Sequence, residues 1–472
     1  MRKTKIICTL GPAVNSVEAI SGLLKRGMNG ARFNFSHGTH ESHLETYLRF
    51  RQACAETGLI AAAILDTKGP EIRIRSFADG KIHLKEGNRF TLRTDIVEGN
   101  ADEVSVTYAD LNRELKSGCT VLIDDGLIKL AVENIEGSKI HCRVMTGGVL
   151  KDNKSINIPE VHINLPTLTE KDRSDLQFAV TNGFDYIAAS FVRTAEDIRI
   201  LRSSLDALGG ETIGIIAKIE NQEGVDNMEE IIRLADGVMV ARGDLGVEIP
   251  AERVPVVQKK MIKQARMAGK PVIIATQMLD SMIERPRPTR AEVSDVANAV
   301  YDKASCVMLS GETASGAYPL QSLETMAAIL VEAEKYVYTE ENKVGAAEYT
   351  VHAVTDAITH TSCLMAQDLK AKAIVTATQG GYTARMLARF RPTCQIVAAT
   401  PLEKTRRKMQ IFWGVAACLY ESAGSTDDLI AYCAMTAEKG GFAKKGDIVV
   451  ITAGVPIGHT GSTNLLKAQI LE

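Results

Sequence analysis

Eight short apolar segments recur along the chain, and each one ends in polar or charged residues. Their apolar character is nearly continuous rather than alternating, which is typical of parallel strands buried on both faces. Helical patterns follow most of them, and two of these helices begin with capping boxes, Thr194 with Asp197 and Thr289 with Glu292. Eight strand–helix units in series predict a (β/α)8 TIM barrel, a fold whose active sites lie at the carboxyl ends of its strands. The predicted strands lie within residues 4–11, 30–38, 61–69, 186–194, 213–222, 236–246, 271–279 and 305–314.

The third strand–helix unit is interrupted by a long insertion. Too many residues separate Thr67 from Tyr186 for a single helix, and residues 71–165 show period-two alternation with frequent turn glycines. This pattern predicts a small all-β domain, of the β-barrel kind. Because the insertion leaves the barrel from the carboxyl end of a strand, we expect it to lie at the mouth and to act as a lid.

A second α/β unit follows the barrel. Residues 341–350 form a polar, glycine-containing linker, and residues 371–390 read as a strand, a glycine turn and a helix, followed by further apolar segments. This predicts a doubly wound α/β domain. We therefore expect a barrel in residues 1–70 and 166–340, a lid in residues 71–165, and a C-terminal α/β domain in residues 341–472.

Composition excludes several classes of partner. The net charge of -3 and the 5% aromatic content give no reason to expect nucleic acid or an anionic membrane surface as a ligand. No apolar run approaches the roughly 18 residues that a membrane span needs. The nine cysteines lie far apart and contain no CxxC pair, which favours free thiols in a reduced, cytoplasmic protein.

The polar strand ends supply the candidate site. Lys218 and Glu220 leave the fifth strand two residues apart, so they point to the same side. Taken alone, this pair could equally be a structural salt bridge or the two walls of a ligand site. The other strand ends favour a site, because they add Arg32, Asn34, Ser36, Asp66, Thr67, Gly243, Asp244, Thr276, Gln277, Ser310 and Glu312.

These residue types suit a metal-bound phosphorylated acid. Glu220 and Asp244 can hold a magnesium ion that keeps open positions for a substrate. Arg32 and Lys218 suit a phosphate and a developing oxyanion. A further group of hard oxygen donors carries only one negative charge and suits a second, weaker cation of the monovalent kind; it consists of Asn34, Ser36, Asp66 and Thr67.

Three other stretches could contact phosphates. Gly69–Pro70 is a turn signal at the start of the insertion, and Arg73 just beyond it could move over the mouth with the lid. Residues 147–155 lack the second glycine of a P-loop, so Lys154 remains only as a single basic residue of the lid. The glycine-rich turn in residues 377–387 precedes a helix and could bind an anion, although such turns also exist for packing alone.

Taken together, these segments resemble the pyruvate kinase family over essentially the whole chain. The motifs that carry the resemblance are ARFNFSHG (31–38), LDTKGPEIR (65–73), KIENQEG (218–224), VMVARGDLGVEIP (238–250) and VMLSGETA (307–314). The resemblance implies transfer of a phosphoryl group from phosphoenolpyruvate to ADP, which gives pyruvate and ATP in the final step of glycolysis. It also implies Mg²⁺ (or Mn²⁺) and K⁺ as cofactors.

The resemblance implies a role for each mouth residue. Lys218 would stabilise the enolate and the moving phosphoryl group, and Arg32 would bind the phosphate. Thr276, with ordered water and Ser310, is the candidate relay that protonates the enolate. The remaining implied ligands are Glu220 and Asp244 for magnesium, Gly243, Asp244 and Thr276 for the substrate carboxylate, Asn34, Ser36, Asp66 and Thr67 for potassium, and Arg73 and Lys154 for the nucleotide.

The resemblance also implies regulation and assembly. Glu71 stands where family members that need potassium have glutamate, so we expect potassium dependence. We expect a homotetramer and a phosphorylated allosteric effector, for which fructose 1,6-bisphosphate, a sugar monophosphate and AMP remain open. The candidate effector residues are Thr376, Thr378, Gly380, Gly381 and Thr383.

Two rival functions remain at this point. One is a magnesium-dependent lyase or aldolase in which Lys218 forms a Schiff base with a carbonyl substrate. The other is a metabolite sensor that has kept the fold but lost turnover. The inserted domain argues against the first, and the presence of Lys218, Glu220, Asp244 and Thr276 together argues against the second.

Overall fold

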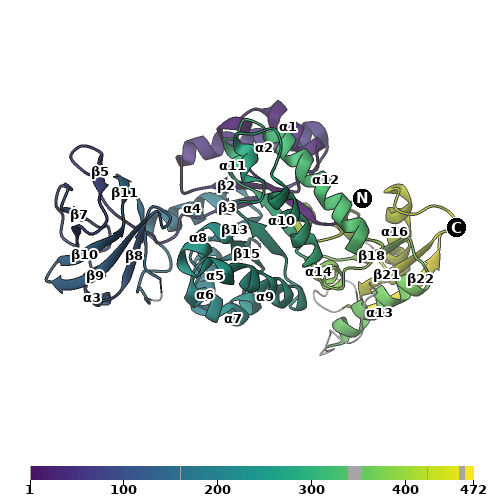
Figure 1. Cartoon of the computed structure of the whole chain (residues 1–472). Helices are drawn as coiled ribbons and strands as arrows, with labels where there is room; N and C mark the ends of the chain where they lie inside the picture. Colours follow the sequence, from purple (N-terminus) through teal and green to yellow (C-terminus); the bar gives the residue numbers. More distant parts are fainter. Residues whose placement is uncertain (1, 160, 338–352, 422–423, 457–462) are drawn as a thin grey trace.

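The computed structural model describes residues 2–159, 161–337, 353–421, 424–456 and 463–472. Figure 1 shows three bodies in a row, with the inserted β domain at one end, the barrel in the middle and the C-terminal domain at the other end. The predicted linker at residues 341–350 lies outside the described residues.

The central body is the predicted barrel. Its eight strands are all parallel and close in the order β1-β17-β16-β15-β14-β13-β3-β2. Each of the eight predicted apolar segments contains one of them, so the barrel prediction is confirmed. The strands are β1 (Lys5–Thr9), β2 (Gly30–Asn34), β3 (Ala62–Asp66), β13 (Tyr186–Ala189), β14 (Gly214–Ile219), β15 (Gly237–Ala241), β16 (Val272–Ala275) and β17 (Cys306–Leu309).

Helices surround these strands. Both predicted capping boxes are present: the hydroxyl of Thr194 accepts the amide of Asp197, and that of Thr289 accepts the amide of Glu292. The α-helices of this body are α1 (Val17–Lys25), α2 (His40–Thr57), α4 (Glu170–Asn182), α5 (Ala195–Ala207), α6 (Gln222–Asp226), α7 (Met228–Leu234), α8 (Arg242–Glu248), α9 (Val254–Met267), α10 (Arg290–Tyr301), α11 (Gly311–Ala314) and α12 (Pro319–Val337). Short 3₁₀ turns in the described part of this body are η1 (Pro12–Val14), η2 (Ala251–Arg253) and η3 (Asp280–Ile283).

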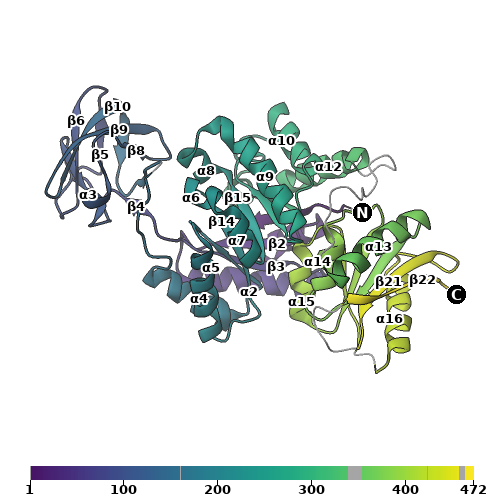
Figure 2. The ribbon, with the colours of Figure 1, turned by 90° about the horizontal axis from the view of Figure 1, so that it is seen from below.

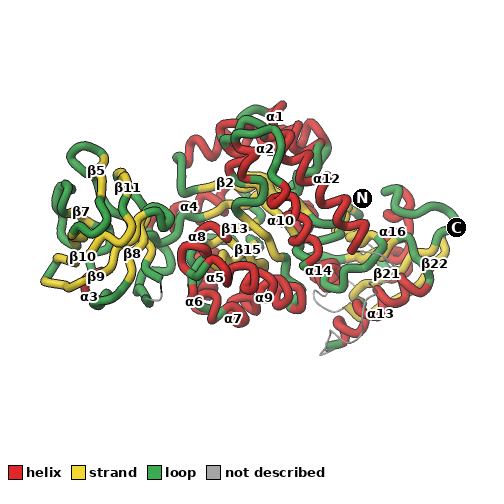
Figure 3. The backbone as a smooth tube through the Cα atoms, in the orientation of Figure 1, coloured by secondary structure: helices red, strands yellow, loops and turns green. Residues whose placement is uncertain are grey.

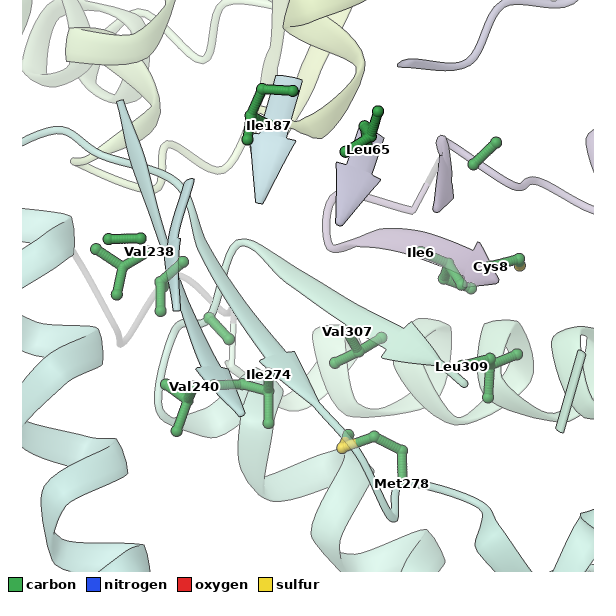
Figure 4. Packing of buried hydrophobic residues seen from close by; sticks show 14 of the residues in the cluster. Ile6, Cys8, Leu65, Ile187, Val238, Val240, Ile274, Met278, Val307 and Leu309 are labelled. Carbon is green, nitrogen blue, oxygen red and sulfur yellow. The ribbon is translucent and has the colours of Figure 1, made fainter. Parts of the chain in front are cut away.

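Strand alternation divides the apolar side chains of the barrel into two layers. Ile6 and Cys8 belong to the layer between strands and helices, and Figure 4 shows this layer on β1, β3, β13, β15, β16 and β17. Ile7 and Ile216 belong to an inner layer that continues into the C-terminal domain through Ile411. The floor of the barrel is therefore closed by apolar packing, and polar chemistry is left to the other end.

The insertion forms a separate β domain with its own apolar core. Figure 3 shows it as strands and loops almost throughout. A seven-stranded sheet has the order β4-β12-β8-β9-β10-β6-β7, and β11 pairs with β5 beside it. Its elements are β4 (Ile72–Arg73), β5 (Lys81–Leu84), β6 (Arg89–Arg93), β7 (Glu103–Ser105), α3 (Leu111–Glu114), β8 (Thr120–Ile123), β9 (Ile128–Glu136), β10 (Lys139–Thr146), β11 (Gly148–Lys151) and β12 (Ser155–Asn157).

The C-terminal domain is a five-stranded sheet with the order β20-β19-β18-β21-β22, and Figure 2 shows helices against it. Four strands are parallel, as predicted, but β22 (Thr463–Ile470) runs antiparallel to β21 and was not predicted. No helix among the described residues is both long and apolar enough to cross a membrane. The other elements are α13 (Val354–Asp368), β18 (Ala373–Ala377), α14 (Tyr382–Ala388), β19 (Gln395–Thr400), α15 (Glu403–Lys408), η5 (Met409–Ile411), β20 (Val415–Leu419), α16 (Thr426–Lys439) and β21 (Ile448–Gly454).

Candidate active site

Lys218 is the centre of a buried charge network at the carboxyl ends of the strands. Its ammonium lies 2.9 Å from Glu220 Oε1 and 3.1 Å from Asp66 Oδ1. It also donates a 2.7 Å hydrogen bond to Ser190 Oγ. The Lys218 side chain is only 11% exposed. Because Lys218 follows the inner-layer residue Ile216 on the same face of β14, the strand itself aims the ammonium into the mouth.

Asp66, the last residue of β3, is shared by two cations. Its other oxygen lies 2.6 Å from Arg32 Nε, and Arg32 also donates to Thr9 Oγ1 at 3.1 Å. Burial would raise the pKa of Asp66, but Arg32 and Lys218 outweigh burial and hold the pKa below its ordinary value. Asp66 is therefore a carboxylate that fixes both cations at the positions where a phosphate would meet them.

The same neighbours set the protonation state of Lys218. Burial alone would lower the pKa of its ammonium, but the carboxylates of Asp66 and Glu220 raise that pKa above its ordinary value. A lysine in this environment carries a positive charge at neutral pH. It can stabilise an anion, but it has no free lone pair with which to attack a carbonyl carbon.

Glu220 and Asp244 meet the requirements of a divalent-metal site. Burial raises the pKa of Glu220 and nearby Asp244 raises it further, whereas Lys218 and the amide of Phe191 oppose the shift. The Phe191 amide donates to Glu220 Oε2 at 2.6 Å and so orients the carboxylate. A divalent cation would relieve the repulsion between the two carboxylates.

A site with only two carboxylates leaves coordination positions for substrate oxygens, which is how Mg²⁺ is commonly held. In the part of the chain that the structure describes, no group of three or more His, Cys, Asp and Glu side chains is arranged to hold a metal. The donor set at the mouth thus fits a substrate-bridged ion rather than a closed structural site.

The candidate potassium residues lie on two adjacent strand ends. Asn34 pairs in register with Asp66, and Asn34 Oδ1 accepts the amide of Ser36 at 3.2 Å. Thr67 Oγ1 accepts the amide of Ser190 at 3.2 Å. The one negative charge of this set, on Asp66, is already balanced by Arg32 and Lys218, so the group presents mainly neutral oxygens.

Thr276 and Gly243 meet across the ends of β16 and β15. The amide of Gly243 donates to Thr276 Oγ1 at 2.8 Å, and the Thr276 hydroxyl donates to the carbonyl of Ala275 at 2.6 Å. Thr276 has a φ of 66°, a left-handed conformation that β-branched residues rarely adopt. Ser310 Oγ is buried without a hydrogen-bond partner among the described residues, and its amide donates to Glu312 Oε2 at 2.7 Å.

Arg73 and Lys154 lie next to each other on the lid, across the β4–β12 pair, and not in the cluster around Lys218. Arg73 forms an ion pair with Glu71 at 2.7 Å and donates to the carbonyl of Asn153 at 2.5 Å. Lys154 forms an ion pair with Asp124 at 2.8 Å. Both cations are thus held by lid carboxylates.

A cleft of about 380 Å³ separates the lid from the barrel. Glu71, which directly precedes β4, and Ile156 of β12 line one side of it, and Asp244 and Glu248 of α8 line the other. Asn157 bridges the two walls, because its amide donates to Glu248 Oε1 at 2.8 Å. The cleft brings lid residues alongside the proposed metal ligand Asp244.

The candidate effector residues surround the turn between β18 and α14. Thr378 Oγ1 accepts the amide of Gly381 at 3.0 Å, and Gly381 has a φ of 81° that glycine adopts without strain. Thr383 and Thr463 share a hydroxyl–hydroxyl bond of 2.7 Å. Thr376 is fully buried within β18, while an added Cβ at Gly380 would meet open space.

Sequence reasoning missed Ser190, which binds both Lys218 and the backbone of Thr67. It also missed Phe191, whose amide orients Glu220 and whose φ is 55°. Both residues follow β13 directly, so the rule that polar strand ends face the mouth could have found Ser190. Nothing in the sequence singles out a backbone amide such as that of Phe191.

Comparisons with known proteins agree with this geometry. The family model "Pyruvate kinase, barrel domain" matches residues 1–323, and "Pyruvate kinase, alpha/beta domain" matches residues 356–469. A pyruvate kinase from Clostridium acetobutylicum is 46% identical over 477 aligned positions, covering 100% of both chains. One from Geobacillus stearothermophilus is 48% identical over 472 positions, covering 100% of this chain and 80% of the relative.

A solved structure shares the whole architecture. The crystal structure of a pyruvate kinase from Cryptosporidium parvum superposes with a TM-score of 0.93 at 39% identity, covering 100% of this chain and 96% of that one. Family model, relatives and structure thus converge over the full length described. The chain belongs to the pyruvate kinase family.

Proposed function

We propose that the barrel mouth carries out the family reaction with Lys218 as the group that takes up the developing charge. In this reaction a phosphoryl group passes from phosphoenolpyruvate to ADP, which yields pyruvate and ATP. The observation that carries the proposal is the environment of Lys218, a buried ammonium held between Asp66, Glu220 and Ser190. The experiment that tests it is pyruvate formation from phosphoenolpyruvate, ADP, magnesium and potassium; absence of turnover under every effector tried would refute it.

Arg32 and Lys218 together bind the phosphoryl group. The oxygen of phosphoenolpyruvate loses its bond to phosphorus while a terminal oxygen of ADP forms one, and the electron pair remains on the enolate oxygen. Such a transfer needs positioning and charge neutralisation more than covalent help. The fixed separation of the two cations by Asp66 supports this role, because neither cation has to reorganise when charge moves.

Glu220 and Asp244 are the proposed ligands of Mg²⁺ or Mn²⁺. The ion supplies Lewis-acid charge to phosphoryl and enolate oxygens when it is bound. The buried position of Glu220, the repulsion from Asp244 and the amide of Phe191 that orients one oxygen all support the assignment.

Gly243, Asp244 and Thr276 are the proposed ligands of the substrate carboxylate. The bond between the Gly243 amide and Thr276 Oγ1 supports a shared subsite, because it brings two different strand ends together. After transfer, the enolate must gain a proton at carbon to become pyruvate. Thr276, ordered water and Ser310 are the proposed relay, and the buried Ser310 hydroxyl without a partner among the described residues supports it.

Potassium is proposed at Asn34, Ser36, Asp66 and Thr67. Their neutral oxygens and the proximity of Asn34 to Asp66 suit a monovalent ion. Arg73 and Lys154 are proposed to bind the nucleotide phosphates. Each cation is paired with a carboxylate of the lid, Arg73 with Glu71 and Lys154 with Asp124. A nucleotide phosphate that replaced these carboxylates would bind directly to the lid.

Regulation and assembly complete the proposal. We assign residues 1–70 and 166–340 to the catalytic domain, residues 71–165 to the lid and residues 341–472 to the regulatory domain. A phosphorylated effector would bind at the turn formed by Thr376, Thr378, Gly380, Gly381 and Thr383. The hydroxyl of Thr378 accepts a turn amide, and the buried hydroxyl of Thr376 has no partner among the described residues. The homotetramer rests on family membership.

The rival Schiff-base chemistry is disfavoured by the state of Lys218. Its carboxylate neighbours raise the pKa of the ammonium, whereas a nucleophilic lysine needs a lowered pKa. Borohydride treatment in the presence of pyruvate should therefore leave Lys218 unmodified. A trapped adduct on this residue would revive the aldolase alternative.

A further inference from the structure

The turn after β16 holds two consecutive residues in the left-handed region. Thr276 has a φ of 66° and Gln277 a φ of 53°. Neither is glycine, and a β-branched residue such as threonine is an outlier there. Such conformations persist only where surrounding contacts over-determine them, and they cluster at functional sites.

Arg242 supplies those contacts from the neighbouring strand end. Its Nε donates to the carbonyls of Ala275 and Thr276 at 3.3 and 3.2 Å. Its Nη2 donates to the carbonyls of Thr276 and Gln277 at 2.7 and 3.2 Å. One guanidinium therefore spans three successive carbonyls, which a lysine ammonium cannot do because it lacks the planar fork.

Asp295 of α10 fixes the guanidinium from its other side. Its two oxygens accept Nη1 of Arg242 at 2.8 and 2.7 Å. The Arg242 side chain is 12% exposed and that of Asp295 33% exposed. This ion pair, in which one guanidinium nitrogen donates to both carboxylate oxygens, restrains the orientation of the guanidinium.

A second charged group holds the far end of the same turn. Glu312, which is 1% exposed, accepts the amide of Leu279 at 3.0 Å with one oxygen and the amide of Ser310 at 2.7 Å with the other. The turn after β16 is thus bonded to its neighbours on both sides, through Arg242 towards β15 and through Glu312 towards β17.

We propose that Arg242, fixed by Asp295, is a positioning residue that sets the affinity for the substrate carboxylate by holding Thr276 in its left-handed conformation. Arg242 directly precedes Gly243, whose amide binds Thr276 Oγ1. Arg242 thus fixes the backbone of the turn, and the amide of Gly243 fixes the hydroxyl of Thr276. This inference rests on the proposed carboxylate subsite at Gly243, Asp244 and Thr276.

The test compares Arg242→Lys with wild-type protein and with Arg253→Lys, a matched control at an exposed arginine that contacts Gln222. Loss of charge-assisted hydrogen bonds predicts that R242K raises KM for phosphoenolpyruvate roughly tenfold or more. KM for ADP should change less than about twofold, because the nucleotide cations lie on the lid. R253K should change neither constant.

A second variant distinguishes loss of the left-handed turn conformation from a general loss of structure in R242K. Gln277→Gly removes the conformational cost of the left-handed residue, because glycine adopts positive φ freely. In the R242K background it should recover at least about a third of the loss in affinity for phosphoenolpyruvate. A merely structural role for Arg242 predicts no such rescue, and equal losses for both substrates.

Thr276→Ala distinguishes a failure of the proposed carboxylate subsite from a failure of the positioning role of Arg242. If T276A leaves KM for phosphoenolpyruvate unchanged, the proposed carboxylate subsite is wrong. If T276A raises that constant while R242K leaves it unchanged in a folded protein, the subsite stands and the positioning role of Arg242 is refuted. Elevated KM in both variants, with rescue by Q277G, supports the inference.

Discussion

The ammonium of Lys218 lies 2.9 Å from Glu220 Oε1; Lys218 belongs to β14, and Glu220 directly follows that strand. The ion pair is therefore real, but it is one edge of a network that includes Asp66, Ser190 and Arg32. Asp66 is shared by Lys218 of β14 and Arg32 of β2, so the network joins side chains from three different strands. Asp66 therefore holds Lys218 through one carboxylate oxygen and Arg32 through the other.

Gly243 is predicted to be needed for substrate rather than for folding. The atoms nearest to a Cβ added there belong to the Thr276 side chain, at 3.6 to 3.7 Å, which is ordinary van der Waals contact. Gly243→Ala should therefore fold normally, but its methyl group would intrude on the proposed carboxylate subsite. We expect KM for phosphoenolpyruvate to rise about tenfold or more, measured by steady-state kinetics.

Gly11 provides the contrasting case. A Cβ there would lie 2.6 Å from the carbonyl oxygen of Ala314, so Gly11→Ala should lower the free energy of unfolding. Normal stability of G11A, or unchanged kinetics of G243A, would contradict this distinction between the two glycines.

Potassium dependence is predicted from Glu71 and the neutral oxygens around Asn34. Activity should fall steeply when potassium is replaced by a bulky organic cation such as tetramethylammonium, and it should return on adding potassium. Glu71→Lys should reduce the dependence, because family members with lysine at this position do not need potassium, whereas Glu71→Gln should not. Full activity of the wild-type protein in the organic cation alone would refute the potassium site.

The lid lysine is predicted to act on nucleotide binding. Lys154 is held by Asp124 at 2.8 Å. Lys154→Met should raise KM for ADP roughly tenfold, the usual scale for losing a charge-assisted phosphate contact, while KM for phosphoenolpyruvate stays within about twofold. Lys151→Met, on exposed strand β11 of the same domain, is the matched control and should leave both constants unchanged. Unaltered ADP kinetics in K154M would exclude the proposed contact.

Lys5 predicts a pH dependence of stability at the floor of the barrel. Burial, and to a lesser extent repulsion from Arg2, lowers the pKa of its ammonium to about 8, although it donates to the carbonyl of Val415 at 2.7 Å. In the unfolded chain this pKa is near 10.5. Between these values the unfolded state binds more protons, so the penalty for burying the charge is full below pH 8 and disappears as pH rises to 10.5.

The corresponding measurement is urea unfolding of wild-type protein and Lys5→Met at pH 8 and pH 10. The stability of wild-type protein relative to K5M should increase with pH, by up to about 3 kcal/mol over the full window. Lys263→Met, at an exposed position of α9, should show no such pH-dependent difference. If the free energy of unfolding differed between wild type and K5M by the same amount at both pH values, the pKa of Lys5 would not be lowered in the folded protein.

Periodicity and strand-end chemistry were enough to predict the barrel and most of its mouth. The eight strands were predictable because parallel strands buried on both faces leave long apolar runs. Lys218, Glu220 and Asp66 were predictable because a barrel converts strand ends, far apart in sequence, into neighbours. Strand β22 escaped because it lies at the sheet edge with half of its side chains exposed, so it lacks a continuous apolar run.

The positioning groups were beyond sequence reasoning for a different reason. Arg242 acts through a fork that reaches three carbonyls, and Phe191 acts through its backbone amide. Neither role produces a recognisable sequence pattern, because each depends on where a neighbouring loop places its backbone groups. The sequence also did not show that the one negative charge of the potassium residues, on Asp66, is balanced by two cations.

The proposed role of Lys218 is to stabilise the charge that develops during phosphoryl transfer. The most direct test is Lys218→Met, with turnover measured by pyruvate formation and substrate binding measured by calorimetry in the presence of magnesium. We expect kcat to fall at least about a hundredfold, the scale of losing a preorganised charge-stabilising donor, while phosphoenolpyruvate still binds within about tenfold of wild type. A folded K218M protein that turns over within about tenfold of the wild-type rate would contradict it.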